Sequence, residues 1–215
     1  MMYSYILARR SPMERQFLFE VKAAILNDAW VMELVNKLAD HHRYSADHCL
    51  NVADLGVTLS LATSRLNTDL SEQLWVAGAL HDIGKLDVPA ELLDDSRKLT
   101  EEEWQMIEGH VRAGYEKVDN PRYEAARNIL IQHHEFGQRR YPRNGSERRQ
   151  GERATERRNP EPVLIEAAKM LAVADSYHAS RTREGRDHQA TMEYLRQDFN
   201  GECSGYLDTM AAIGC

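Results

Sequence analysis

Apolar residues recur at helical spacing along most of the chain, and this pattern restricts the fold more than any other feature. Between Met13 and Asp40 the apolar side chains follow one another at intervals near three and four, which is the pattern of an amphipathic helix. No stretch alternates apolar and polar residues as a half-buried strand does, and the sequence contains no repeat and no glycine-rich phosphate loop. The sequence therefore predicts an all-α protein.

Local start signals divide the rest of the pattern into helices. Ser45 or Asp47 is expected to cap the first of them. Thr100 with Glu103 forms a capping box, and Asn120-Pro121 is a cap followed by a first-turn proline. Helices are thus predicted after His48, over residues 71–83, from 101 past His110, from 121 to 134, over 162–180, and as two short pieces of 192–213 broken at Asn200-Gly201.

Composition limits the class of protein. The 215 residues suffice for one sizeable domain, which we place at residues 41–215 behind an N-terminal helical segment at residues 1–40. The net charge of −7 argues against nonspecific binding to DNA or to an anionic membrane. Three scattered cysteines make no disulfide framework, and the apolar patch near the N-terminus is too short to span a bilayer. These features predict a soluble, cytoplasmic protein.

Seven polar residues fall on or beside the predicted apolar faces: His48, His81, Asp82, His110, His133, His134 and Asp175. A buried polar group without a partner costs roughly 2–7 kcal/mol, so a common ligand is expected to satisfy them. Imidazoles and carboxylates without thiolate suit iron, manganese, nickel or zinc. Seven ligands exceed the need of one ion. Two ions about 3.5–4 Å apart, bridged by one carboxylate, would use them, hold a phosphate and generate hydroxide from water.

Lys85 follows the His81-Asp82 pair closely. If the helix continues to Lys85, the ammonium lies one turn beyond the pair and on the same face. A cation beside a metal and a carboxylate suggests a phosphate substrate. The alternative is that Lys85 only complements the helix dipole, a contribution of about 0.3–1 kcal/mol.

Between Gly137 and Pro162 the chain carries eight arginines among polar residues, which describes a solvated mobile loop. We hypothesise that this loop folds over nucleotide phosphates or binds a partner. Arg139, Arg140 and Arg143 are the candidate substrate-binding residues within it.

The order of these residues resembles the HD-domain metal-dependent phosphohydrolases, in particular the HD-GYP branch. The resemblance runs over residues 44–183, and it is carried by His48, the run His81-Asp82-Ile83-Gly84-Lys85, His110, the run His133-His134-Glu135, and Asp175. It implies a helical bundle that hydrolyses the bacterial messenger cyclic di-GMP to linear pGpG, GMP or both.

The resemblance also implies roles for single residues. Lys85 would contact the scissile phosphate, and a hydroxide bridging two divalent metals, iron or manganese first and nickel or zinc as alternatives, would attack it. The first metal would be held by His48, His81, Asp82 and Asp175, and the second by Asp82, His110, His133 and His134, with Asp82 bridging.

The chain departs from the pattern of that branch at three places. The Gly-Tyr-Pro signature is one residue shorter and keeps only Tyr141-Pro142. Tyr44 stands where members with three metals have a glutamate, which predicts two metals. His178 replaces a usual acidic residue and is expected to hydrogen-bond Asp175 rather than to add a ligand.

Other functions stay open at this stage. The chain is either an HD phosphohydrolase for a cyclic dinucleotide or another nucleotide, or an inactive signalling module that binds a nucleotide or a protein partner. The amphipathic helix from Met13 to Asp40 would provide a surface for a homodimer.

Overall fold

The computed structural model describes residues 12–63, 65, 67–94, 97–138 and 161–213. Within these ranges it contains helices and turns but no strand, so the predicted all-α fold is confirmed. The arginine-rich segment with Arg139, Arg140 and Arg143, and the Tyr141-Pro142 remnant, lie outside the described residues.

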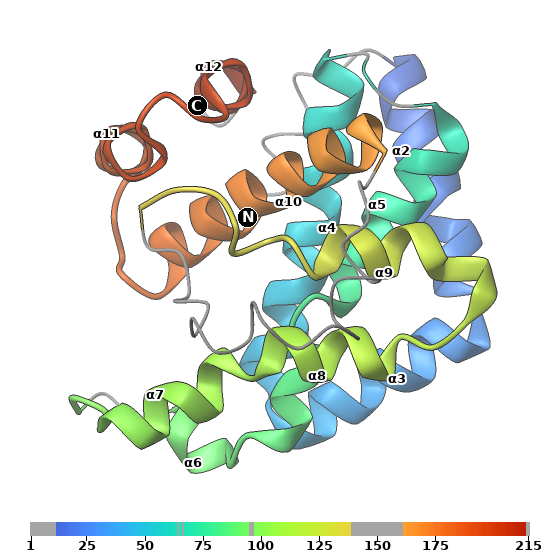
Figure 1. The fold of residues 1–215 in the computed structure, drawn as a ribbon. Helices are drawn as coiled ribbons and strands as arrows, with labels where there is room; N and C mark the ends of the chain where they lie inside the picture. Colours follow the sequence, from blue (N-terminus) through green and yellow to red (C-terminus); the bar gives the residue numbers. More distant parts are fainter. Residues whose placement is uncertain (1–11, 64, 66, 95–96, 139–160, 214–215) are drawn as a thin grey trace.

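The helical elements are α2 (Pro12–Leu26), α3 (Ala29–His41), α4 (Arg43–Thr63), α5 (Thr68–Leu80), the 3-10 helix η1 (Ile83–Asp87), α6 (Ala90–Leu93), α7 (Glu101–Glu108), α8 (His110–Lys117), the 3-10 helix η2 (Pro121–Tyr123), α9 (Glu124–Leu130), α10 (Pro162–Thr182), α11 (His188–Phe199) and α12 (Ser204–Ile213). In Figure 1, α10 crosses the middle of the view, α11 and α12 lie at the upper left, and α3 and α8 lie at the bottom.

The core forms where α4 packs against both α5 and α10. Trp75 of α5, Leu59 of α4 and Tyr177 of α10 are fully buried there. Gly78 permits the close approach of α5 to α4, because a Cβ at this position would lie 2.5 Å from the Cα of Ala53. The three helices therefore form a rigid frame that positions the ends of neighbouring elements.

The part of the N-terminal segment that the structure describes, from residue 12 on, forms two helices, not the single helix predicted between Met13 and Asp40. Asp28 ends the continuity, because its carboxylate accepts hydrogen bonds from the backbone N–H groups of Trp30 and Val31 at 3.0 and 3.1 Å. Such a cap satisfies the free N–H groups at the start of a new helix. The apolar faces of α2 and α3 join the same core as the remainder of the chain.

Helix ends differ from the prediction at the three points where the polar residues gather. α5 ends at Leu80, so Lys85 lies on η1 and not on a continued face of α5. The predicted helix through His110 is broken at Gly109 into α7 and α8. α9 ends at Leu130, which leaves His133 and His134 in the turns that follow it.

The start of α4 also differs from the prediction. The helix begins at Arg43, so Ser45 and Asp47 lie within its first turns and neither is the cap. His42 stands directly before α4, and its ring is buried, with Nδ1 2.8 Å from Ser45 Oγ and Nε2 3.0 Å from an Asp94 carboxylate oxygen.

Other local predictions are confirmed. Thr100 Oγ1 accepts from the backbone N–H of Glu103, whose carboxylate accepts from the N–H of Thr100 at 2.8 Å. Asn120 caps the turn that opens with Pro121. α11 and α12 are separated at Asn200 and Gly201, with φ values of +43° and +86°.

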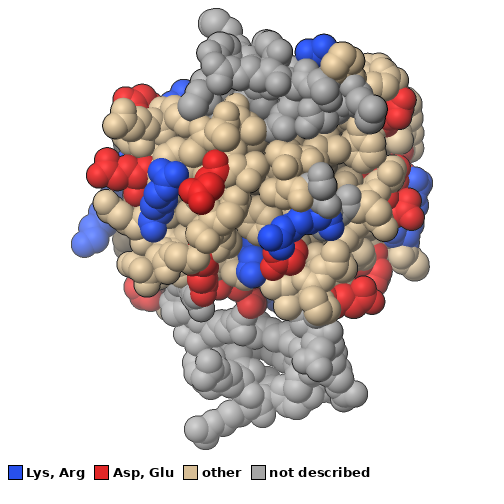
Figure 2. All heavy atoms as spheres, turned by 90° about the horizontal axis from the view of Figure 1, so that it is seen from above, with Lys and Arg blue, Asp and Glu red and all other residues tan. Residues whose placement is uncertain are grey.

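The surface carries charged residues of both signs, as the composition predicts. On the face shown in Figure 2, lysine and arginine are interspersed with aspartate and glutamate. None of the described helices is long and apolar enough to cross a membrane.

Candidate metal centre

The seven predicted ligands come from five separate parts of the chain and meet at one place. His48 lies on α4, His81 and Asp82 on the turn from α5 to η1, His110 at the start of α8, the next two histidines after α9, and Asp175 on α10. Their donor atoms form three overlapping groups, each within 4.8 Å: His48 with His81 and Asp82; His110 with His133 and His134; and His81 with His133 and Asp175.

Hydrogen bonds to the backbone fix the orientation of three of the imidazoles. The Nδ1 atoms of His81, His110 and His133 lie 2.8, 2.5 and 2.5 Å from the carbonyl oxygens of Gly78, Ile107 and Leu130. Each acceptor precedes its histidine by three residues. Because a carbonyl can only accept, Nδ1 carries the proton, and the lone pair of Nε2 points into the centre. Metal-binding histidines are commonly oriented by this kind of bond.

Three of the imidazoles, those of His81, His133 and His134, are held in the neutral form that binds metals. Burial lowers the pKa of His81, and burial together with the neighbouring histidines lowers the pKa of His133 well below its usual value. Burial lowers the pKa of His134 to about 3. His133 Nε2 is buried and has no hydrogen-bond partner among the described residues. A metal ion would supply that partner, so the residues fit a metal ion.

The two aspartates remain ionised in these surroundings. Burial would raise the pKa of Asp82, but Lys85, His81 and His110 outweigh burial and hold it well below the usual range. Burial acts in the same direction on Asp175, and its hydrogen bond to His48 and the nearby histidines outweigh it and lower the pKa.

The oxygen atoms of Asp82 face different groups. Its Oδ1 lies 3.2 Å from His110 Nε2, whereas its Oδ2 lies 3.6 Å from His81 Nε2 and 2.5 Å from Lys85 Nζ. Asp175 Oδ1 lies 2.9 Å from His48 Nε2 and 3.7 Å from His81 Nε2. One carboxylate thus touches both halves of the histidine cluster.

His178 has a different partner from the one predicted. Its Nδ1 lies 2.8 Å from Nδ1 of His48, and its ring is buried against that histidine instead of bonding to Asp175. His48 lies on α4 and His178 lies on α10. The spacing of residues along one helix does not report contacts with another helix, and the predicted partner of His178 was therefore wrong.

The centre opens into a cavity of about 610 Å³, a size typical of small-molecule sites. Lys85 contributes to its wall. The sequence analysis missed other lining residues, among them Tyr44, Glu101, Trp104, Glu108, Phe136 and Arg183. A signal present in the sequence was Trp104 itself, a large aromatic residue directly after the three glutamates that open α7.

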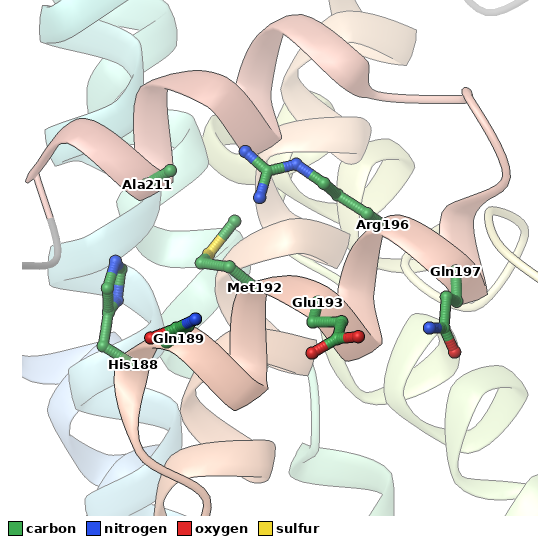
Figure 3. A pocket seen from close by; sticks show the side chains of 7 residues that line it. All are labelled: His188, Gln189, Met192, Glu193, Arg196, Gln197 and Ala211. Atoms are coloured by element: carbon green, nitrogen blue, oxygen red, sulfur yellow. The ribbon is translucent and has the colours of Figure 1, made fainter.

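A second hollow lies between α11 and α12 and is drawn in Figure 3. Met192 and Arg196 of α11 and Ala211 of α12 line it, together with four other residues. None of the seven clustered residues belongs to its lining, so the metal centre and this hollow are separate.

Comparison with known families agrees with this geometry. Residues 45–180 match the family described as HD domain. The chain belongs to the HD domain family. The match begins three residues before His48 and ends five residues after Asp175, so it encloses all seven clustered residues of the HD centre.

Relatives of this HD domain include proteins named as phosphodiesterases. A cyclic di-GMP phosphodiesterase of Pseudomonas aeruginosa is 28% identical over 118 residues, which cover 54% of this chain and 28% of that protein. Two 3'3'-cGAMP-specific phosphodiesterases of Vibrio cholerae, numbers 1 and 3, are 33% and 35% identical over 37% and 40% of this chain and 18% and 19% of their own length. The matches thus span less than a third of each relative.

The fold of this HD domain has a counterpart among solved structures. The HD domain of the phosphodiesterase PgpH from Listeria monocytogenes superposes with a TM-score of 0.56 and 14% identity, over 84% of this chain and 94% of that one. A complex of the same domain with cyclic di-AMP gives a TM-score of 0.55. The HD-domain bundle predicted from the sequence is thereby confirmed as the fold.

Proposed function

We propose that the chain is a metal-dependent phosphodiesterase of the HD-GYP branch that hydrolyses cyclic di-GMP to pGpG, GMP or both. The observation that carries this proposal is the convergence of seven histidine and aspartate donors at one cavity. Five of the seven donors line the cavity wall together with Lys85. The cyclic di-GMP phosphodiesterase of Pseudomonas aeruginosa supports the choice of substrate, because it matches over half of this chain.

The donor groups suggest how two divalent metals would be shared. One would be held by His48, His81, Asp82 and Asp175, and the other by Asp82, His110, His133 and His134. Asp82 is suited to bridging because its Oδ1 faces His110 and its Oδ2 faces His81. Iron and manganese are the favoured ions, and nickel and zinc accept the same ligands. When bound, such ions lower the pKa of water enough to supply hydroxide at neutral pH.

The protein groups have distinct tasks in this proposal. The backbone bonds to three Nδ1 atoms keep the imidazoles oriented without rearrangement. Lys85 is held at the cavity by Asp82 and would offset the negative charge that builds up on the phosphate oxygens during in-line displacement. The ribose 3' oxygen is the leaving group, so the first product is linear.

The proposal is tested with anaerobically purified protein whose metal content is determined. We expect cyclic di-GMP to be converted to pGpG or GMP, as followed by chromatography, and we expect His81→Ala to abolish conversion. Arg139, Arg140 and Arg143 stay proposed phosphate contacts: their joint replacement should raise KM and leave kcat unchanged. If the protein binds two metals per chain and converts no cyclic dinucleotide, the proposed substrate is wrong.

Another cyclic dinucleotide is the second candidate substrate. Two relatives are named as 3'3'-cGAMP-specific, and a related structure contains cyclic di-AMP. The same assay with 3'3'-cGAMP and cyclic di-AMP ranks these two compounds and cyclic di-GMP by kcat/KM. Absence of bound metal under all conditions would favour an inactive binding module instead.

His178 provides a prediction about metal affinity. Because its Nδ1 lies 2.8 Å from His48 Nδ1, it can accept the proton of that ring and direct the Nε2 lone pair of His48 toward the metal. Replacement of such an outer partner typically costs 10–100-fold in metal affinity. We therefore expect His178→Phe to lower metal affinity about tenfold or more, as measured by competition with a chelator.

The matched control is His188→Phe. His188 Nδ1 lies 3.0 Å from the Tyr177 hydroxyl, and His188 lines the separate hollow between α11 and α12, so this variant should retain the metals. Equal metal affinity of the two variants would contradict the role assigned to His178.

A further inference from the structure

One face of α7 forms part of the wall of the metal-centre cavity. Glu101, Trp104 and Glu108 all line that cavity, and their spacing of three and four residues places them on the same side of the helix. The indole of Trp104 is 46% exposed. Met106 is 45% exposed on the same helix but does not line the cavity. The α7 face is therefore a distinct surface of this cavity.

The stability of α7 does not explain why a glutamate stands at position 108. Glu101 lies in the first turn of α7, where a carboxylate complements the helix dipole, and Glu103 completes the capping box. Glu108 is the last residue of α7, and there a negative charge is unfavourable. Its position in the cavity wall gives this carboxylate a different task.

The chemistry of the α7 face suits a planar base with hydrogen-bond donors. An indole offers a flat surface on which any nucleobase can stack. Ionised carboxylates only accept hydrogen bonds. Guanine presents N1–H and N2–H₂ as adjacent donors, whereas adenine presents one amino group beside the lone pair of N1. A carboxylate would gain two bonds from guanine and would repel the lone pair of adenine.

We propose that Glu101, Trp104 and Glu108 form a nucleobase subsite that selects guanine over adenine. The proposal rests on the proposed function, because the metal centre that lines the same cavity would hold the phosphate of the same nucleotide. Trp104 supplies the stacking surface. The two glutamates supply the selectivity.

Equilibrium binding of GMP and AMP to the metal-loaded full chain tests the subsite. By isothermal titration calorimetry we expect GMP to bind at least about tenfold tighter than AMP, since each hydrogen bond to a charged group contributes about tenfold or more. Glu108→Gln and Glu101→Gln should reduce the ratio of the GMP affinity to the AMP affinity, because the glutamine amide can pair with adenine as well. Glu102→Gln is the matched control, since Glu102 is exposed on α7 outside the cavity wall.

Trp104 is tested in the same way. Trp104→Ala should weaken the binding of both GMP and AMP about tenfold, whereas Trp104→Phe should bind both nucleotides more tightly than Trp104→Ala. Met106→Ala should leave both affinities unchanged. Equal binding of GMP and AMP by the wild-type protein, or changes in Glu108→Gln and Trp104→Ala no larger than in their controls, would overturn the subsite.

Hydrolysis of bis(p-nitrophenyl) phosphate, measured in parallel, separates this proposal from the proposed function. This diester carries no nucleobase, so its turnover reports the metal centre without the subsite, and it should be equal in wild-type and Glu102→Gln proteins. If the protein binds GMP selectively but does not hydrolyse this diester, the result contradicts the proposed phosphodiesterase activity and supports the subsite. If the protein hydrolyses the diester but binds GMP and AMP equally, the result supports the phosphodiesterase activity and overturns the subsite.

Discussion

Replacing Gly84 with alanine is expected to lower the free energy of unfolding by about 3 kcal/mol and to remove most of the bound metal. An added Cβ would lie near the carbonyl oxygen of His110 in steric overlap, and 2.6 Å from the backbone nitrogen of Gly114. Overpacking usually costs about 1–3 kcal/mol when side chains can move. Here the opposing atoms belong to the backbone of α8, so η1 and α8 must separate.

The separation would also damage the metal centre. Asp82 directly precedes η1 and His110 begins α8, and their side chains lie 3.2 Å apart. Moving the two elements apart therefore separates two proposed ligands. Urea unfolding and metal analysis measure the two effects in the same preparation.

Gly56→Ala is the matched control for Gly84→Ala. Gly56 lies on α4, and the atoms nearest to a Cβ there belong to the side chain of Leu74, at 3.6 Å, which is an ordinary contact. Alanine is favoured over glycine inside a helix by about 1 kcal/mol, so this variant should be at least as stable as the wild type. Equal stability of the two variants would contradict the close packing of η1 on α8.

Replacing Asp82 with asparagine is expected to reduce turnover by about 10³-fold or more. A bridging carboxylate is proposed to hold both metals, whose charge contributes several kcal/mol to the transition state, and each 1.36 kcal/mol is a factor of ten in rate. Metal content should fall from two per chain to one or fewer. Asparagine keeps the size of the side chain, so the effect reports the charge.

Asp47→Asn provides the comparison. Asp47 stands beside His48 in the sequence but is exposed and pairs with Arg43 at 3.1 Å. Its variant should keep two metals and full turnover. An Asp82→Asn protein with two metals and turnover within tenfold of the wild type would exclude a bridging role for this carboxylate.

Local sequence signals predicted well where helical elements begin or break. The capping box at Thr100, the Asn120-Pro121 start and the break at Asn200-Gly201 were all confirmed. The break at Asp28 was missed because α2 and α3 continue the same apolar pattern toward one core. Periodicity reports which face is buried and cannot distinguish one helix from two that share a face.

The sequence by itself determined the fold class and the kinds of donor atoms available, because helical spacing and residue chemistry are local properties. The tertiary structure decided that five separate parts of the chain meet at one centre. It also decided that η1, and not a continued α5, carries Lys85, and that His178 meets His48. The pairing of His178 depends on how α4 and α10 pack, and packing between helices distant in sequence has no signal in the spacing of residues along either one.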